Sequence, residues 1–201
     1  MEKLLISNTP HVRGKASTRR IMIDVLIALA PAAVAGIVFF GWRAALIIAL
    51  ALISCVGSEV VYRLILKESF KHIVSTYDFT SSVTGLLLGI NLGSQSPWYA
   101  PILGGIFAIV VVKMLFGGTG KNFVTPAIAG RLFIVISFGA AVGSGWLTPS
   151  IPAIVSTNGS VPSLVDLFLG TGVMGCIGET SKLALIIGGA YLVIRDRKSV
   201  G

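Results

Sequence analysis

Charged residues are scarce in this sequence. Only 12% of its 201 residues are Asp, Glu, Lys or Arg, whereas about a quarter of the residues of a soluble domain are charged. Hydrophobic residues make up 54%, and the mean hydropathy is +0.91. This composition excludes a water-soluble enzyme.

Motifs of soluble binding proteins are also missing. The formal charge of +8 comes from 16 Lys and Arg against 8 Asp and Glu, but no nucleic-acid-binding motif accompanies the basic residues. Cys55 and Cys176 stand alone in apolar stretches, and His11 and His72 have no neighbours at ligand spacing. We therefore expect no nucleic-acid partner, no metal, and two buried cysteines that act as small hydrophobic residues.

Long apolar runs make up most of the chain. The first run is long enough to cross a bilayer core of about 30 Å as a helix, and it leads directly into a second, unlike a secretory signal. The expected fold class is an all-α membrane protein with a cytoplasmic amino-terminal segment (1–20), a transmembrane helical bundle (21–194) and a cytoplasmic tail (195–201). The six expected transmembrane crossings, in contact with membrane lipid, are residues 21–42, 44–66, 81–93, 99–116, 126–146 and 164–194.

Lysine and arginine lie on one side of the predicted membrane. The three connections assigned to the outside carry Arg43 and no other basic residue. Because Lys and Arg are retained on the cytoplasmic side, we expect a multi-pass protein of the inner (cytoplasmic) membrane with both ends of the chain in the cytoplasm. The basic residues assigned to the cytoplasm are Lys3, Arg13, Lys15, Arg19, Arg20, Arg63, Lys67, Lys71, Lys113, Lys121, Arg131, Arg195, Arg197 and Lys198.

Three glycine-rich stretches interrupt the apolar runs, at residues 81–93, 116–123 and 170–181. Lipid hydrocarbon cannot hydrogen-bond an open backbone, so such stretches must be buried in protein or line a cavity. The first is also too short to cross upright, which favours a tilted or discontinuous segment. The sequence therefore predicts a site between bundled helices.

The loop at residues 117–121 reads G-G-T-G-K, but it lacks the preceding strand and the Lys-Ser/Thr ending of a phosphate-binding P-loop. One interpretation is that its free backbone N–H groups, with Lys121 and Arg131 nearby, cradle a phosphate or the polar edge of a ring. The other is a helix-breaking turn with a lysine that sets topology. The spacing alone favours neither.

Glu179 lies near the middle of the last apolar run. A carboxylate at that depth is costly and is usually functional or paired. Lys182, one helical turn later, is the expected partner. The alternative to a functional carboxylate is an ion pair that only fixes helix packing.

The other carboxylates near the spans are interpreted as structural. Glu59 and Arg63 form an i, i+4 pair near the end of the second run. Asp24 and Asp78 lie near span edges as boundary residues. Asp78 is placed to cap a helix that opens at residue 80 or 81.

Four ordered motifs carry a family resemblance. They are S-N-T-P-H-V-R-G at residues 7–14, V-T-G-L-L-L at 83–88, F-G-G-T-G-K-N-F at 116–123 with P-A and G-R shortly after it, and G-E-T-S at 178–181. The chain resembles the flavin-carrying membrane subunits of ion-pumping respiratory complexes: the D-type subunit of the Rnf complex and the B-type subunit of the sodium-pumping NADH:quinone oxidoreductase. The Rnf-type subunit is the closer resemblance, because the long leader of the quinone-reducing enzyme does not precede the first run.

The resemblance implies a subunit of a translocase, an oxidoreductase complex that passes electrons between reduced ferredoxin and NAD and couples them to sodium or proton movement. The other Rnf subunits are the implied partners. The implied fold is a bundle with inverted repeats. The chain is expected to be its amino-terminal part or a shortened form of the subunit, because family members continue for several spans beyond residue 201.

The resemblance also implies two flavins: FMN, joined through its phosphate to a threonine in an S-G-A-T-like loop, and riboflavin, held without a covalent bond. The corresponding outer loop, residues 147–163, contains no S-G-A-T. Thr157, which follows Ser156, is the candidate attachment site, and a plain loop threonine is the alternative.

The flavin carries the chemistry in this hypothesis, so no catalytic side chain is expected. A non-redox channel or secondary carrier for an ion or small solute also suits glycine-broken helices around a carboxylate, and a purely structural subunit is a third alternative. By motif position, Glu179, Thr180 and Ser181 border an ion pathway or flavin site, and the residues that line or support a flavin pocket are Thr84, Gly85, Gly117, Gly118, Thr119, Gly120, Asn122 and Arg131.

Overall fold

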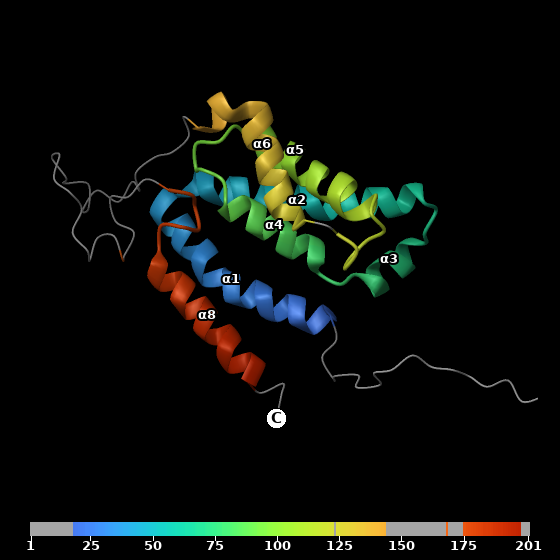
Figure 1. Cartoon of the computed structure of the whole chain (residues 1–201), viewed down its shortest axis with the longest axis horizontal. Coiled ribbons are helices and arrows are strands. Elements are labelled where there is room, and N and C mark those ends of the chain that lie inside the picture. The colour runs from blue at the N-terminus through green and yellow to red at the C-terminus, as the bar shows by residue number, and fades with distance from the viewer. Residues whose placement is uncertain (1–17, 123, 144–167, 169–174, 198–201) are drawn as a thin grey trace, which may run out of the picture.

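The computed structural model describes residues 18–122, 124–143, 168 and 175–197, and every regular element in these ranges is a helix (Figure 1). The all-α class is therefore confirmed for the described residues. In chain order the helices are α1 (Thr18–Phe40), α2 (Trp42–Ile65), α3 (Phe70–Thr76), α4 (Thr80–Ile90), α5 (Tyr99–Ile106), the π-helix η1 (Phe107–Met114), α6 (Pro126–Gly143) and α8 (Lys182–Arg197).

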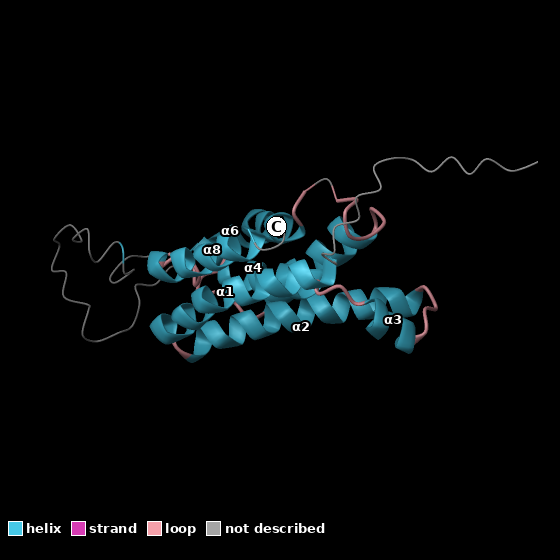
Figure 2. Cartoon of the chain, turned by 90° about the horizontal axis from the view of Figure 1, so that it is seen from below, coloured by secondary structure: helices cyan, strands magenta, loops and turns pink. Residues whose placement is uncertain are grey.

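Helices α1 and α2 are the two described helices that are long and apolar enough to span a membrane. They have 23 and 24 residues. Gly41 alone separates them, so the chain reverses direction there (Figure 2), and α4 packs against both helices. These helices match the first two predicted crossings, while the count of six stays a prediction.

Helix α4 is short, as predicted for a discontinuous segment. Its 11 residues rise about 16 Å, roughly half of a bilayer core. After Ile90 the backbone continues without regular structure, yet Leu92, Ser94 and Ser96 are buried. The open backbone of this stretch is thus covered by protein, as a glycine-rich interruption in a membrane requires.

Helix α4 packs in the centre of the bundle, against α1, α2 and α6 (Figure 1). A Cβ atom added at Gly85 would lie 2.9 Å from the carbonyl oxygen of Ala51 and from the Cα of Leu52, both in α2. Only glycine permits this approach of the two backbones. The V-T-G-L-L-L motif therefore has a packing role in addition to any role in a site.

Two helices depart from regular α geometry, which the sequence pattern did not indicate. The second half of the predicted crossing at residues 99–116 is the π-helix η1, and α6 is kinked at Phe138 (φ −131°, ψ 29°). A π-helix widens each turn and changes which side chains face inward, and such segments are frequent at functional sites.

The bundle is apolar outside and charged inside. Val38, Ile53 and Ile136 are 64%, 69% and 75% exposed, whereas Glu59 and Lys113 are 0% and 2% exposed. This is the arrangement expected of helices in lipid, where ionisable side chains face the interior. The described structure therefore supports a membrane protein.

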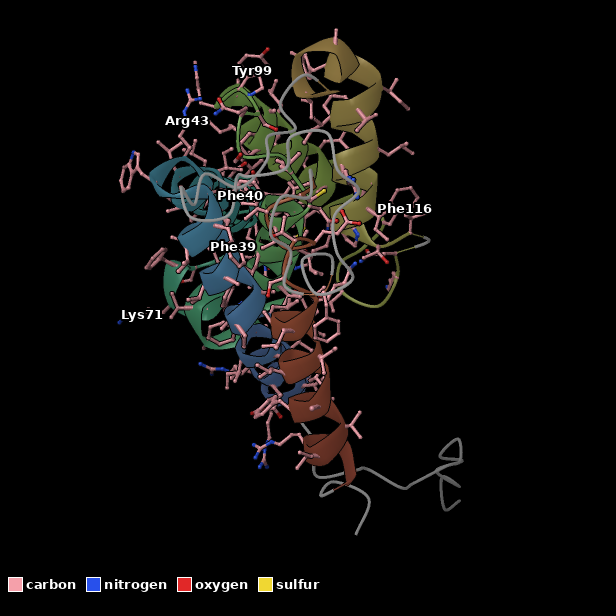
Figure 3. All side chains as sticks on the ribbon, turned by 90° about the vertical axis from the view of Figure 1, so that its left-hand side faces the viewer. Phe39, Phe40, Arg43, Lys71, Tyr99 and Phe116 are labelled. Atoms are coloured by element: carbon pink, nitrogen blue, oxygen red, sulfur yellow. The ribbon has the colours of Figure 1, made fainter. Side chains whose placement is uncertain are left out.

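Two basic residues lie near the two ends of α2. Arg43 lies at its first turn and is hydrogen-bonded to Gln95. Lys71, which Figure 3 labels, belongs to α3, and α3 lies beyond the carboxyl end of α2 (Figure 1). The two residues thus lie near opposite ends of α2, and the side of the membrane that each one faces stays a prediction.

Helix α8 lies antiparallel to α1 (Figure 1). The Nε of Arg195 is 3.2 Å from Asp24 Oδ2, and the Tyr191 hydroxyl donates to Asp24 Oδ1 at 3.3 Å. The interpretation of Asp24 as only a boundary residue is therefore incomplete, because its carboxylate joins the first and last described helices.

Candidate functional site

A buried ion pair joins α2 to η1. The ammonium of Lys113 lies 3.0 Å from Glu59 Oε2, and both side chains are almost completely buried. Lys113 also donates to Thr80 Oγ1 at 2.6 Å and to Ser81 Oγ at 3.0 Å. An ammonium has three N–H donors, so this lysine is fully satisfied although it is away from water.

The other oxygen of the Glu59 carboxylate, Oε1, pairs with Arg63. Arg63 lies 2.7 Å from Glu59 Oε1, which confirms the predicted i, i+4 pair. Ser81 donates to the Oε2 atom as well. Spacing within one helix indicates Arg63 as a partner but not Lys113, whose place in the sequence suggested only a role in topology. The position of Lys113 within an apolar run could have indicated this role, because a lysine at membrane depth is usually paired with a carboxylate.

The polar network continues from Thr80 towards the surface. Asp78 Oδ1 accepts the backbone N–H of Thr80 at 3.1 Å and its hydroxyl at 2.6 Å, so it binds the first N–H of α4 although the N-cap position is Phe79. Asp78 Oδ2 accepts the hydroxyl of Thr119 at 2.8 Å. Burial by itself raises the pKa of Asp78, but these hydrogen bonds and the charge of Lys113 outweigh it and hold the pKa below its usual value.

Residues 117–122, called the glycine loop below, follow η1 directly. The N–H of Gly117 binds Met114 O, that of Gly118 binds Lys113 O, and that of Lys121 binds Gly118 O. These three N–H groups are therefore not free to cradle an anion, because they are hydrogen-bonded to carbonyls of the turn and of the end of η1. The side chain of Asn122, at the end of the loop, is not satisfied in this way. Its buried Oδ1 has no hydrogen-bond partner in the described part of the chain.

A second junction lies at the other end of α4. Arg131 donates to Asn91 Oδ1 at 3.1 Å and lies 3.5 Å from Cys176 Sγ, and the thiol of Cys176 donates to Asn91 O at 3.1 Å. The N–H groups of Ile177 and Gly178 bind Leu92 O and Ile90 O. Two interrupted segments, distant in the sequence, thus meet in the bundle.

Arg131 does not lie beside the glycine loop. It contacts the end of α4 at Asn91, whereas Thr119 contacts the start at Thr80, and these ends are about 16 Å apart. The positive charge of Arg131 at the carboxyl end of α4 also complements the dipole of that helix. Cys176, expected to be a small hydrophobic residue, is buried but has these polar neighbours.

The G-E-T-S motif lies at this junction, just before α8. Glu179 and Lys182 are both exposed, and the ion pairs of the described residues do not include one between them. The expected partnership fails because α8 begins only at Lys182, so the two residues do not share a helical turn. Ser181 Oγ accepts the N–H of Ala184 at 3.3 Å, and Thr180 Oγ1 is buried with no partner among the described residues.

The remaining predicted flavin residues are separated. The hydroxyl of Thr84 donates to Thr80 O at 2.9 Å within α4, and Gly85 faces α2. Thr157 lies outside the described residues. The structure thus brings Thr119 to the start of α4 and leaves Arg131 at its end.

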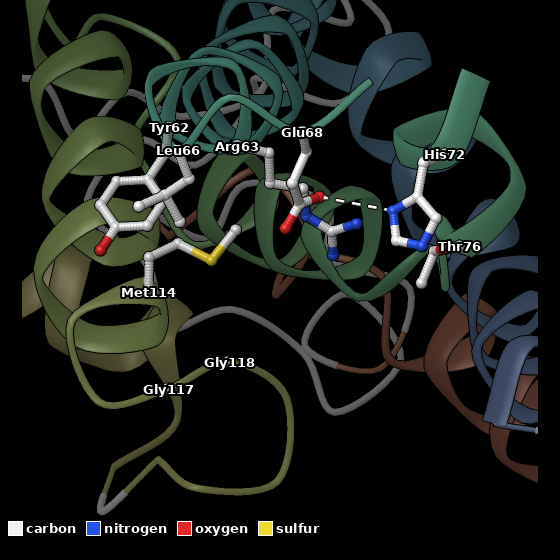
Figure 4. A pocket seen from close by; sticks show the side chains of 9 residues that line it. All are labelled: Tyr62, Arg63, Leu66, Glu68, His72, Thr76, Met114, Gly117 and Gly118. Carbon is white, nitrogen blue, oxygen red and sulfur yellow. Dashed lines mark ion pairs between the residues drawn. The ribbon is translucent and has the colours of Figure 1, made fainter. Parts of the chain in front are cut away.

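A cavity of about 320 Å³ opens where α2, α3 and the glycine loop meet (Figure 4). This volume is at the lower end of the range for small-molecule sites, about 300–1,000 Å³. An ion pair between Glu68 and His72, 3.7 Å apart, lies on its wall. The lining residues are Tyr62, Arg63, Leu66, Glu68, His72, Thr76, Met114, Gly117 and Gly118.

Comparison with known proteins identifies relatives along nearly the whole chain. The model of the NQR2, RnfD, RnfE family matches residues 5–200. The chain is 43% identical over 204 residues to the D-type subunit of the Na(+)-translocating ferredoxin:NAD(+) oxidoreductase complex of Acetobacterium woodii, covering 96% of this chain and 63% of that protein. It is 34% identical over 185 residues to the D-type subunit of the ion-translocating oxidoreductase complex of Escherichia coli, covering 92% and 51%. The chain therefore spans between half and two thirds of the length of these curated relatives.

Proposed function

Because the chain belongs to the NQR2, RnfD, RnfE family, we propose that it is part of a membrane subunit of an Rnf-type ion-translocating oxidoreductase. In this proposal the complex passes electrons between ferredoxin and NAD and couples them to the movement of sodium ions or protons across the inner membrane. The other subunits of the complex are its partners. The observation that carries the proposal is the 43% identity to the Acetobacterium woodii protein across 96% of the chain.

Flavin is the cofactor in this proposal, as FMN and riboflavin. The glycine loop offers a fitting acceptor: the buried Oδ1 of Asn122 lacks a donor among the described residues and suits a flavin N–H or a ribityl hydroxyl. The cavity beside Gly117 and Gly118 adds an apolar and aromatic wall. Bound flavin would supply the redox chemistry, while Gly120 and Asn122 line its site, Thr119 supports the loop that carries them, and the bundle excludes water.

The other predicted residues take supporting roles in the proposal. Gly85 lets α4 pack closely against α2, Thr84 is hydrogen-bonded within α4, and Arg131 ties the end of α4 to the segment before α8. Glu179, Thr180 and Ser181 border the ion pathway. The buried hydroxyl of Thr180, which has no partner among the described residues, supports this assignment, because a buried polar group without a partner is costly and calls for one.

A census of cofactors on the purified full-length subunit tests the flavin proposal. We expect a yellow protein that releases riboflavin on acid precipitation and retains FMN that fluoresces in a denaturing gel. Thr157→Val is expected to abolish the retained fluorescence, because a valine has no hydroxyl to hold the phosphate. Thr148→Val, in the same loop, is the control and should leave it unchanged. A colourless native preparation that still moves a solute into liposomes would favour the channel or carrier.

Reporter fusions test the six crossings and the orientation. A cytoplasm-active reporter fused after residue 201 is expected to give signal, and an externally active reporter inserted at residues 147–163 is expected to do the same. The reason is the retention of Lys and Arg on the cytoplasmic side, where 14 of the 16 basic residues are assigned. An externally active fusion after residue 201 would contradict both the count and the orientation.

A further inference from the structure

The conformation of the glycine loop depends on glycine. Gly117, Gly118 and Gly120 have φ angles of +97°, +93° and +89°, which side-chain-bearing residues rarely adopt. A Cβ atom at Gly118 or Gly120 would meet nothing within 4 Å, so these glycines are needed for the backbone turn and not for space. Glycine loses more conformational freedom on folding than any other residue, so this loop requires an anchor to stay in one conformation.

Thr119 provides such an anchor. Its hydroxyl donates to Asp78 Oδ2 at 2.8 Å, and Asp78 is 41 positions earlier in the chain. The backbone hydrogen bonds of Gly117, Gly118 and Lys121 are all local to the loop and the end of η1. The bond from Thr119 therefore fixes the loop against the start of α4.

Asp78 is itself held rigidly. It accepts both the N–H and the hydroxyl of Thr80, and that hydroxyl oxygen accepts from the buried ammonium of Lys113. Each threonine hydroxyl has one proton, and both protons point to Asp78, so the 3.3 Å contact between Thr80 and Thr119 needs no hydrogen bond of its own. Phe79, which lies between Asp78 and Thr80, has a φ of +63°. This strained conformation persists only where its surroundings impose it.

We infer that Asp78 is a positioning residue for the glycine loop: it holds the loop through Thr119 and couples it to the buried pair of Lys113 and Glu59, without touching a ligand. The loop and the ion pair then move as one unit. The geometry stands by itself, and its meaning for flavin binding rests on the proposed function. Loss of the Thr119 hydroxyl should open the loop and weaken retention of non-covalent flavin.

The test compares Thr119→Val with Thr119→Ser in the full-length subunit within its complex. Valine keeps the size of threonine and removes the hydroxyl, serine keeps the hydroxyl, and the exposed position of Thr119 leaves the core intact. We expect deuterium exchange of the amides at residues 117–121 to be about tenfold faster in Thr119→Val and unchanged in Thr119→Ser, since the lost bond has a charged acceptor. The dissociation constant of riboflavin, followed by its fluorescence, should rise by a similar factor.

A second variant separates the bond from general damage. Asp78→Ala removes the same bond from the other side, so its effect on loop exchange should not add to that of Thr119→Val in the double variant. Unchanged exchange in Thr119→Val, or full additivity, would overturn the inference. Faster exchange with unchanged riboflavin binding would support the positioning role of Asp78 and refute the loop as a flavin site. A wild-type complex without flavin would refute the proposed function, and the exchange result would still decide the role of Asp78.

Discussion

Replacing Lys113 with methionine is expected to destabilise the folded protein by about 3–5 kcal/mol. Methionine keeps much of the volume of the side chain but removes the ammonium that lies 3.0 Å from Glu59 Oε2. The oxygens of Thr80 and Ser81 lose the same donor. A carboxylate that is 0% exposed is then left with incomplete compensation, which costs far more than the loss of a surface pair.

Unfolding of the purified full-length subunit in detergent, followed by circular dichroism, measures this effect. Lys121→Met is the matched control, because Lys121 is an exposed lysine and its loss should change the free energy of unfolding by less than about 0.5 kcal/mol. The double variant Lys113→Met with Glu59→Leu should recover only part of the loss, because it removes the buried carboxylate but leaves Arg63, whose side chain is 16% exposed, without its partner. A single Lys113→Met variant as stable as the wild type would show that the pair contributes nothing to stability.

Gly85→Leu is expected to destabilise the protein by about 3 kcal/mol and to reduce its assembly in the membrane. The first atom of any side chain at this position would lie 2.9 Å from the backbone of α2 at Ala51 and Leu52. Backbone atoms cannot turn away as a flexible side chain can, so α4 and α2 must separate. That separation opens the central contact of the bundle.

A graded series of alanine and leucine variants measures this contact with the same unfolding assay. Gly85→Ala should cost less than Gly85→Leu but remain destabilising. Gly57→Ala in α2 is the control, because a Cβ there meets nothing within 4 Å and alanine is favoured over glycine in a helix by about 1 kcal/mol. Equal effects of the two alanine variants would contradict the close approach of α2 and α4.

Several elements follow from local sequence pattern. The apolar runs predicted α1 and α2, and the short third run predicted that α4 would not cross the bilayer as one helix. The Glu59–Arg63 pair and the placement of Asp78 at the start of α4 also follow from spacing within one element. These features depend on residues a few positions apart, and a sequence shows such neighbours directly.

The candidate site was harder to predict. Lys113 and Glu59 are 54 positions apart, and the π-helix that carries Lys113 has no pattern that distinguishes it from an ordinary helix. Arg131 was placed with the glycine loop because it follows it closely in the sequence, yet it binds Asn91, 40 positions earlier. Proximity along the chain is a poor guide wherever helices reverse direction between two residues.

The amino-acid sequence by itself predicted helices surrounded by lipid and the points at which these helices break, because hydropathy and glycine content are local properties. The side of the membrane that the Lys and Arg residues face stays a prediction. Only the tertiary structure decided which buried charges meet, which glycines serve packing, and that the glycine loop is fixed by Asp78. Those outcomes depend on how α2, α4 and η1 come together, and long-range contacts of this kind leave no trace in residue spacing.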